Sequence, residues 1–163
     1  MRPSDVFECA RESAIRIHEI DDELETLRSR VGGQGTGFGT SISHSTVLDP
    51  TRSLDDLMER EPVLEAERAE CSGDVEDAWV LITGLEAGGK RDYADMLARF
   101  YVYAHDEEKV ATDTVMVMAA MRGDDVPLER AVRMCGAMRR GALRYCDRVG
   151  IAKLRGDALC HSR

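Results

Sequence analysis

Arginine is concentrated in residues 128–148, where its spacing suits recognition of an anion. If the segment is laid out as a helix at about 100° per residue, five arginines lie within roughly 40° of their mean direction. They are Arg130, Arg133, Arg140, Arg144 and Arg148. We call this set the arginine row. Phosphate suits it, because a guanidinium binds phosphate through two hydrogen bonds and can also donate to guanine in the major groove.

The sign of the charge separates this face from an ordinary solvated helix face, which mixes acidic and basic residues. Only Glu129 and Asp147 interrupt the positive run. Glu129 would accept a hydrogen bond from cytosine, whereas Arg148 would reach the DNA backbone at most. The candidate DNA-contacting residues are therefore Glu129, Arg130, Arg133, Arg140 and Arg144.

An apolar stripe on the opposite side of the same segment predicts an amphipathic helix with charge and core on separate faces. The stripe consists of Ala131, Cys135, Met138, Ala142, Cys146 and Val149. Arg139 falls near its edge, where either the side-chain stem snorkels or the helix deviates at Gly136 and Gly141. The methionines at 116, 118, 121, 134 and 138 are predicted to fill the core between the last two helices.

The net charge of the whole chain contrasts with this segment. Its 163 residues include 31 acidic residues against 22 Lys and Arg, which gives a net charge of -9. Residues 121–163 alone carry ten basic and five acidic residues, so the sign reverses there. An acidic remainder resists nonspecific adhesion to nucleic acid and to anionic membranes. The asymmetry predicts two different roles for the two parts of the chain.

The elements that would position the arginine row are all predicted to be helices, because no alternating strand pattern occurs. The fold class is all-α, with an N-terminal helical hairpin or coiled coil followed by a C-terminal helix-turn-helix. An apolar heptad through residues 6–31 would pair with a helix of the same chain or of a second copy. The other helices are expected from Ser53 with a kink or restart at Pro62, over 92–104, over 106–121 and from Pro127 to about 148, with a turn at 123–125.

Composition divides the chain into five segments. They are an amphipathic helix at 1–31, a flexible Gly/Ser/Thr-rich linker at 32–52, a second long helical segment at 53–91, the helix-turn-helix at 92–155 and a disordered tail at 156–163.

The C-terminal part of the sequence carries a family resemblance. Residues 93–151 read YADMLARFYVYAHDEEKVATDTVMVMAAMRGDDVPLERAVRMCGAMRRGALRYCDRVGI, with a pattern similar to LxxRY at Leu97, Arg99, Phe100 and Tyr101. This stretch resembles the C-terminal part of phage-encoded transcriptional regulators typified by RinA and ArpU, which is similar to region four of bacterial sigma factors. The resemblance implies sequence-specific binding to double-stranded DNA and regulation of transcription. The N-terminal helix would then serve homodimerisation or contact with RNA polymerase.

Two positions depart from that family and support an alternative function. Pro127 and Ala131 stand where the recognition helix of the family has Ser and Thr, so two phosphate-contacting hydroxyls are absent. The alternative is an all-helical interaction module for RNA polymerase or a phage partner that has lost DNA binding. A distant third interpretation is a degenerate P-loop, because Gly84, Gly89 and Lys90 have its spacing. Arg91 replaces the Ser or Thr that would hold magnesium, so a helix end is favoured there.

No catalytic residue, cofactor or metal site is predicted. The four histidines are scattered, and the five cysteines contain no CxxC pair, which fits a reducing cytoplasm. No apolar run suits a signal peptide or a membrane span. The sequence therefore predicts a cytoplasmic protein that is not an enzyme.

Overall fold

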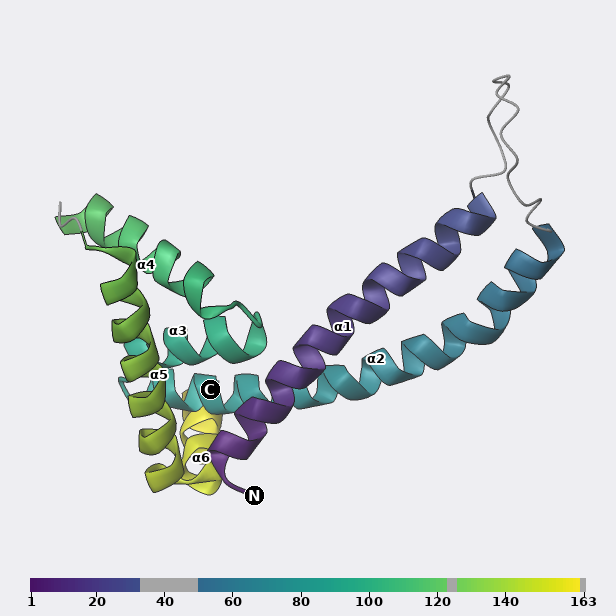
Figure 1. The fold of residues 1–163 in the computed structure, drawn as a ribbon. Helices are drawn as coiled ribbons and strands as arrows, with labels where there is room; N and C mark the ends of the chain where they lie inside the picture. The colour runs from purple at the N-terminus through teal and green to yellow at the C-terminus, as the bar shows by residue number, and fades with distance from the viewer. Residues whose placement is uncertain (33–49, 123–125, 162–163) are drawn as a thin grey trace. The chain divides into compact units, whose positions relative to one another are not determined.

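The computed structural model describes residues 1–32, 50–122 and 126–161 (Figure 1). Within these residues all regular structure is helical and no strand occurs, which confirms the predicted all-α class. The elements are α1 (Pro3–Gly32), α2 (Pro50–Ala87), α3 (Arg91–Leu97), the π-helical turn η1 (Ala98–Val102), α4 (Glu107–Arg122), α5 (Leu128–Val149) and α6 (Ile151–His161). None of the described helices has an apolar stretch long enough to span a membrane.

The chain forms two compact units. The smaller unit is Arg16–Cys71, and the larger unit combines Met1–Ile15 with Ser72–Arg163. The predicted linker at 32–52 and the turn at 123–125 fall almost entirely outside the described residues. Where the linker is described, Gly32 ends α1 and α2 already begins at Pro50.

Leucine and isoleucine side chains hold the smaller unit together. Ile20, Leu24 and Leu27 of α1 are buried against Leu64 of α2, with Leu57 packed beside them. The α1 residues belong to the apolar heptad that the sequence shows. Ion pairs flank this small core, including Arg16 to Glu67 at 2.7 Å, Arg28 to Glu61 at 2.5 Å and Arg68 to Asp21 at 2.7 Å. Exposed pairs of this kind contribute roughly 0–1 kcal/mol each, so the burial of the apolar side chains dominates.

The predicted restart at Pro62 does not occur. α2 continues through Pro62 as one helix of 38 residues. A proline inside a helix removes one backbone donor and crowds the preceding turn, a cost of about 3 kcal/mol. Here Leu57, five residues before Pro62, and Leu64, two residues after it, both pack into the core of the smaller unit. Burial on both sides of the proline offsets this local cost.

The core of the larger unit brings together side chains from every helix of the chain. α5 packs against α3, α4 and α6. The fully buried large side chains of this core are Phe7 from α1, Leu81, Ile82 and Leu85 from α2, Leu97, Phe100, Val110, Cys146 and Leu154. The predicted positions of α4 and α5 are confirmed to within one residue at each end.

The helix predicted at 92–104 is found over 91–102, but its second half is not a regular α-helix. An α-helix begins at Arg91, but the chain widens to a π turn at Ala98, where the Tyr103 backbone N–H donates to the Ala98 carbonyl at 2.9 Å. Phe100, Tyr101 and Val102 are consecutive in the sequence and all buried. A regular α-helix spreads three successive residues over some 200° of its surface, so the wider π turn accommodates this buried run.

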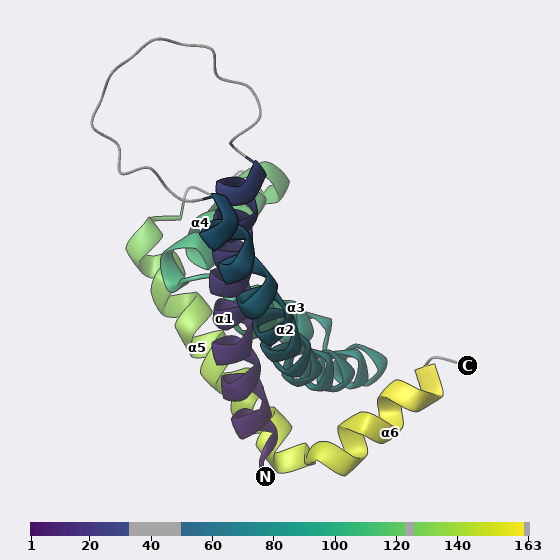
Figure 2. The ribbon, with the colours of Figure 1, turned by 90° about the vertical axis from the view of Figure 1, so that its right-hand side faces the viewer.

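The predicted disordered tail at 156–163 is also wrong over 156–161, where the chain is helical. Gly150, with φ of 85°, separates α5 from α6, and α6 turns away from the α5 axis there (Figure 2). Leu154 and Ala158 of α6 are buried. The sequence of α6 has a weak apolar pattern, so contact with the rest of the larger unit stabilises it. Residues 162 and 163 lie outside the described part.

Gly84 allows α6 to approach α2 closely. A Cβ built on Gly84 would lie 2.0 Å from the backbone oxygen of Leu154, far inside van der Waals contact. The glycine that could have belonged to a P-loop is therefore a point of close helix packing. Gly73, in the same helix, is exposed and has nothing within 4 Å of its added Cβ.

These two glycines make a matched pair of substitutions in one helix. Gly84→Ala should lower the free energy of unfolding by about 1–3 kcal/mol, because α6 must shift away from α2. Gly73→Ala should raise it by about 0.5–1 kcal/mol, because alanine loses less backbone entropy in a helix. Urea unfolding followed by far-ultraviolet circular dichroism measures both. Equal effects at the two positions would contradict the packing of α6 on α2.

Candidate functional site

α5 separates its apolar and charged residues as the sequence predicts, with one exception. Ala131, Cys135, Ala142 and Cys146 are buried in the core of the larger unit. Burial raises the pKa of the Cys146 thiol to about 12, so this cysteine stays protonated and serves as an apolar core residue. Met138 departs from the stripe and is 38% exposed.

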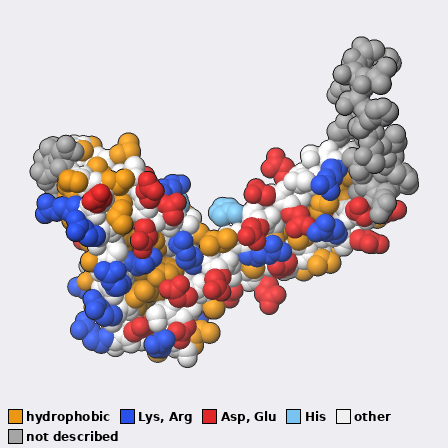
Figure 3. Space-filling view, in the orientation of Figure 1, with side chains coloured by type: hydrophobic (Ala, Val, Ile, Leu, Met, Phe, Trp, Pro, Cys, Tyr) orange, Lys and Arg blue, Asp and Glu red, His pale blue; other side chains and the backbone are white. Residues whose placement is uncertain are grey.

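All five arginines of the arginine row are exposed, and so is Glu129. Figure 3 shows the blue side chains of Lys and Arg gathered over α5, with few red ones among them. The structure therefore places the predicted DNA-contacting residues together on one outer face of one helix.

Ion pairing distinguishes the arginine row from the other arginines. Elsewhere in the described chain most arginines pair with a carboxylate, namely Arg2, Arg16, Arg28, Arg60, Arg68, Arg99, Arg139 and Arg155. No described carboxylate lies within 4.0 Å of a guanidinium of the arginine row. Arg133 makes one long contact, from Nε to the Glu129 carbonyl at 3.4 Å. The positive charge of α5 is therefore left uncompensated by the described residues.

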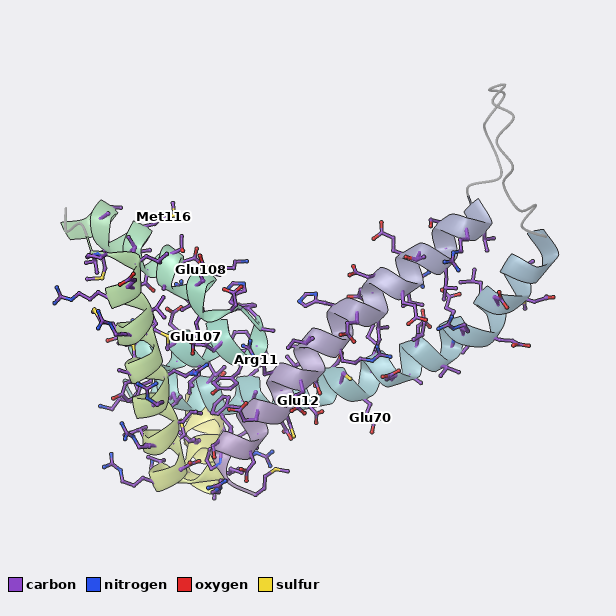
Figure 4. All side chains as sticks on the ribbon, viewed as in Figure 1. Arg11, Glu12, Glu70, Glu107, Glu108 and Met116 are labelled. Carbon is purple, nitrogen blue, oxygen red and sulfur yellow. The ribbon has the colours of Figure 1, made fainter. Side chains whose placement is uncertain are left out.

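Arg139 attaches α5 to other helices of the larger unit. Its guanidinium carbon lies 4.7 Å from the centre of the Phe100 ring, and its Nη2 lies 2.8 Å from Glu107. Figure 4 places Glu107 at the start of α4, facing α5. Arg139 is therefore a structural residue that joins α5 to η1 and α4. Its position at the apolar edge needs neither a break in α5 nor an exposed charge.

The π turn that receives Arg139 is held from its other side by α1. Arg11 donates through Nη1 to the carbonyls of Phe100 and His105, the latter at 3.1 Å, and Figure 4 places Arg11 beside this turn. Tyr101 donates to Glu8 of α1 at 3.1 Å. Burial, reinforced by Glu8, raises the pKa of Tyr101 to about 12, so its hydroxyl remains a donor. The sequence does not reveal Arg11, because its partners are backbone atoms far along the chain.

The prediction that the methionines of 116–138 fill the core is wrong for most of them. Met116, Met121, Met134 and Met138 are exposed by 66, 79, 46 and 38%. The buried residues of α4 and α5 are valine, alanine, glycine and cysteine, and no methionine of these two helices is among them. An apolar groove of about 590 Å³ opens beside the methionines. We call it the methionine groove, and it is lined mainly by Met96, Val117, Met118, Met121, Met134 and Met138.

Residues 84–90 form a helix end, as the sequence favours. α2 runs through Ala87, Gly89 has φ of 72°, and the Lys90 backbone N–H donates to the Leu85 carbonyl at 2.8 Å. A P-loop follows a strand of a parallel sheet, and the described part of the chain has a helix in that place. Nor do the described residues bring three or more His, Cys, Asp or Glu side chains together as a metal site would require.

Comparisons of this chain with protein families, with curated proteins and with solved structures give no match.

Arg139 and Arg140 are neighbours in the sequence, but their different contacts predict unequal effects of alanine substitution on stability. Arg139→Ala should lower the free energy of unfolding by about 1–3 kcal/mol, because it removes the Glu107 pair and the stacking on Phe100. Arg140→Ala should change it by less than about 0.5 kcal/mol, because Arg140 is exposed and unpaired among the described residues. Thermal and urea unfolding of both variants provide the test. A large loss of stability for Arg140→Ala would mean that the arginine row has a structural role.

Proposed function

We propose that this chain is a DNA-binding regulator of transcription of the phage and prophage type that residues 93–151 resemble. α4 and α5 would act as a helix-turn-helix, with α5 as the recognition helix in the major groove. The observation that carries the proposal is the arginine row, whose charges are exposed and have no carboxylate partner among the described residues. Five like charges on one face repel one another, and an anionic partner relieves that repulsion.

The roles of the individual residues follow from their positions on α5. Arg130 and Arg133 lie in the first two turns, which are the turns that a recognition helix presents to base edges. Glu129 beside them can accept from cytosine. Arg140 and Arg144 lie further along and would contact phosphates or the edges of the groove.

The acidic character of the other helices favours binding to particular DNA sequences over nonspecific adhesion to DNA. In the smaller unit the arginines that the structure describes are mostly engaged with glutamate and aspartate, as Arg16, Arg28 and Arg60 are. Those guanidinium groups are already neutralised and offer little to phosphate. Unpaired positive charge is then concentrated on α5, while α1 and the first half of α2 would serve homodimerisation or contact with RNA polymerase.

The salt dependence of DNA binding tests this function. The chain should bind duplex fragments from its own genomic neighbourhood, with log K falling linearly as log salt rises. Arg133→Ala/Arg140→Ala should weaken binding and make the slope shallower by up to about two, since each lost phosphate contact removes roughly 0.9. Fluorescence anisotropy over a salt series measures both quantities.

The matched control for this double variant is Arg28→Ala/Arg155→Ala, which removes the same charge from ion-paired positions outside α5. It should leave the slope unchanged. If the wild type shows no saturable binding at low salt, or if both double variants behave alike, the proposal is wrong.

The methionine groove supports a second candidate function, an all-helical interaction module for RNA polymerase or another protein partner. Flexible, polarisable methionine side chains suit surfaces that adapt to a partner, and exposed apolar patches commonly mark such sites. The groove lies beside the arginine row, since Met134 and Met138 belong to α5 as well.

Substitutions in the groove separate this candidate from DNA binding. If the chain acts as an interaction module, Met134→Asp/Met138→Asp should reduce binding to purified RNA polymerase at least tenfold, which corresponds to about 1.4 kcal/mol. The reason is that the substitutions place charge where apolar surface would be buried. Arg133→Ala/Arg140→Ala should retain that binding. Surface plasmon resonance with immobilised polymerase is the measurement, and equal binding by all three proteins would argue against the groove.

A further inference from the structure

A second group of unpaired cations lies where the turn between α2 and α3 meets the end of α5. Lys90 belongs to this turn, and its Nζ lies 5.5 Å from the centre of the Tyr145 ring. Arg148, one turn after Tyr145, places its guanidinium carbon 5.5 Å from the same ring centre. Two positive charges from distant parts of the sequence therefore share one aromatic ring.

The Tyr145 ring is held in place by its own neighbours. It is half-buried, and the Tyr93 ring of α3 lies 5.8 Å away at an interplanar angle of 59°. Tyr93 in turn approaches α5, since its hydroxyl lies 3.8 Å from the position of a Cβ added to Gly141. The cations at this ring are thus presented on a packed surface, with both Lys90 and Arg148 exposed to solvent.

Contact with the Tyr145 ring does not neutralise these two cations. A single cation over an aromatic ring gains from the ring's electron density, but a second cation at the same ring is repelled by the first. The turn does not depend on the Lys90 side chain, because its backbone N–H makes the closing hydrogen bond to Leu85. Among the described residues, Lys90 and Arg148 have no carboxylate within 4.0 Å. Glu86 and Asp92 line the hollow beside Lys90, but neither forms such a pair.

The length of α5 indicates what this group would meet. At about 1.5 Å per residue, the axial distance from Arg130 to Arg148 is roughly 27 Å. The major groove is about 12 Å wide, so a helix that places its first turns in the groove carries its last turn out to the sugar-phosphate backbone. Lys90 and Arg148 would lie where α5 leaves the groove and meets the backbone. Arg91, which follows Lys90 in the sequence, is also exposed and unpaired among the described residues.

We propose that Lys90, Tyr145 and Arg148 form a contact site for the phosphodiester backbone of duplex DNA, separate from the base-reading part of α5. This inference rests on the proposed DNA-binding function and extends it to a residue outside α5. The site fixes the orientation of the recognition helix and carries no sequence preference, because phosphates are the same at every base pair.

The test compares Lys90→Ala/Arg148→Ala with the wild type over the same salt series and on several duplex fragments. The variant should bind every fragment more weakly, with a slope shallower by about two, and should keep the order in which the fragments are preferred. Lys90→Arg/Arg148→Lys keeps both charges and should restore the slope. Circular dichroism of each variant verifies that it is folded.

The matched control is Lys109→Ala/Arg30→Ala, which also removes one lysine and one arginine that are exposed and unpaired among the described residues. Its slope should equal that of the wild type. If the wild type binds DNA but Lys90→Ala/Arg148→Ala keeps the wild-type slope, or if the control changes as much, the backbone site is refuted while the DNA-binding function stands. A changed order of fragment preference would overturn the separation from base reading. If the wild type binds no fragment, both proposals fail.

Discussion

The larger unit depends on one interaction, the capping of the π turn by Arg11. The turn at Ala98–Val102 lets a run of consecutive residues face the core, but it interrupts the regular helical hydrogen bonds of its carbonyls. Arg11 donates to the Phe100 carbonyl inside this turn and to the His105 carbonyl just after it, and a buried carbonyl without a donor would be costly. With the turn fixed, the Phe100 ring stacks against Arg139 of α5. Glu107, at the start of α4 just after the turn, pairs with the same arginine. The position of α5 therefore depends on a contact made by α1.

Two classes of arginine result from this arrangement. Arg11, Arg99 and Arg139 are partly buried and bound to carbonyls, carboxylates or an aromatic ring, so their charge is used within the protein. The arginine row faces solvent and has no carboxylate partner among the described residues. Arg148 instead contacts the Tyr145 ring, and Arg133 makes its long contact with the Glu129 carbonyl. Arg139 and Arg140 are adjacent in the sequence but belong to different classes, because a helix turns by about 100° per residue. The proposed DNA-binding surface consists of arginines that form no ion pair within the described part of the protein.

The small side chains of α5 explain why charge and apolar groove lie so close together. Ala131, Cys135 and Ala142 are small buried side chains of α5, and α3 and α4 both pack against this helix. The methionines then have no place in the core and line its margin instead. One helix thus presents a row of exposed arginines and an apolar edge, and in the proposed function this would allow a DNA-bound regulator to contact a protein partner beside the DNA.

The pattern of residues along the chain is enough to predict the all-α class, the ends of α4 and α5, the heptad of α1 and the separation of arginines from core on α5. These features depend on periodicity and on glycine or proline punctuation, which are local properties of the chain. Four features depend instead on the folded arrangement: α2 continues through Pro62, residues 98–102 form a π turn, α6 is a helix, and most of the methionines are exposed. In each case contacts between distant residues outweigh local preference, as when Leu154 packs over Gly84 or Arg11 caps the π turn. The meeting of Lys90 with Arg148 at Tyr145 likewise needed the fold, since sequence spacing cannot bring a turn beside a helix end.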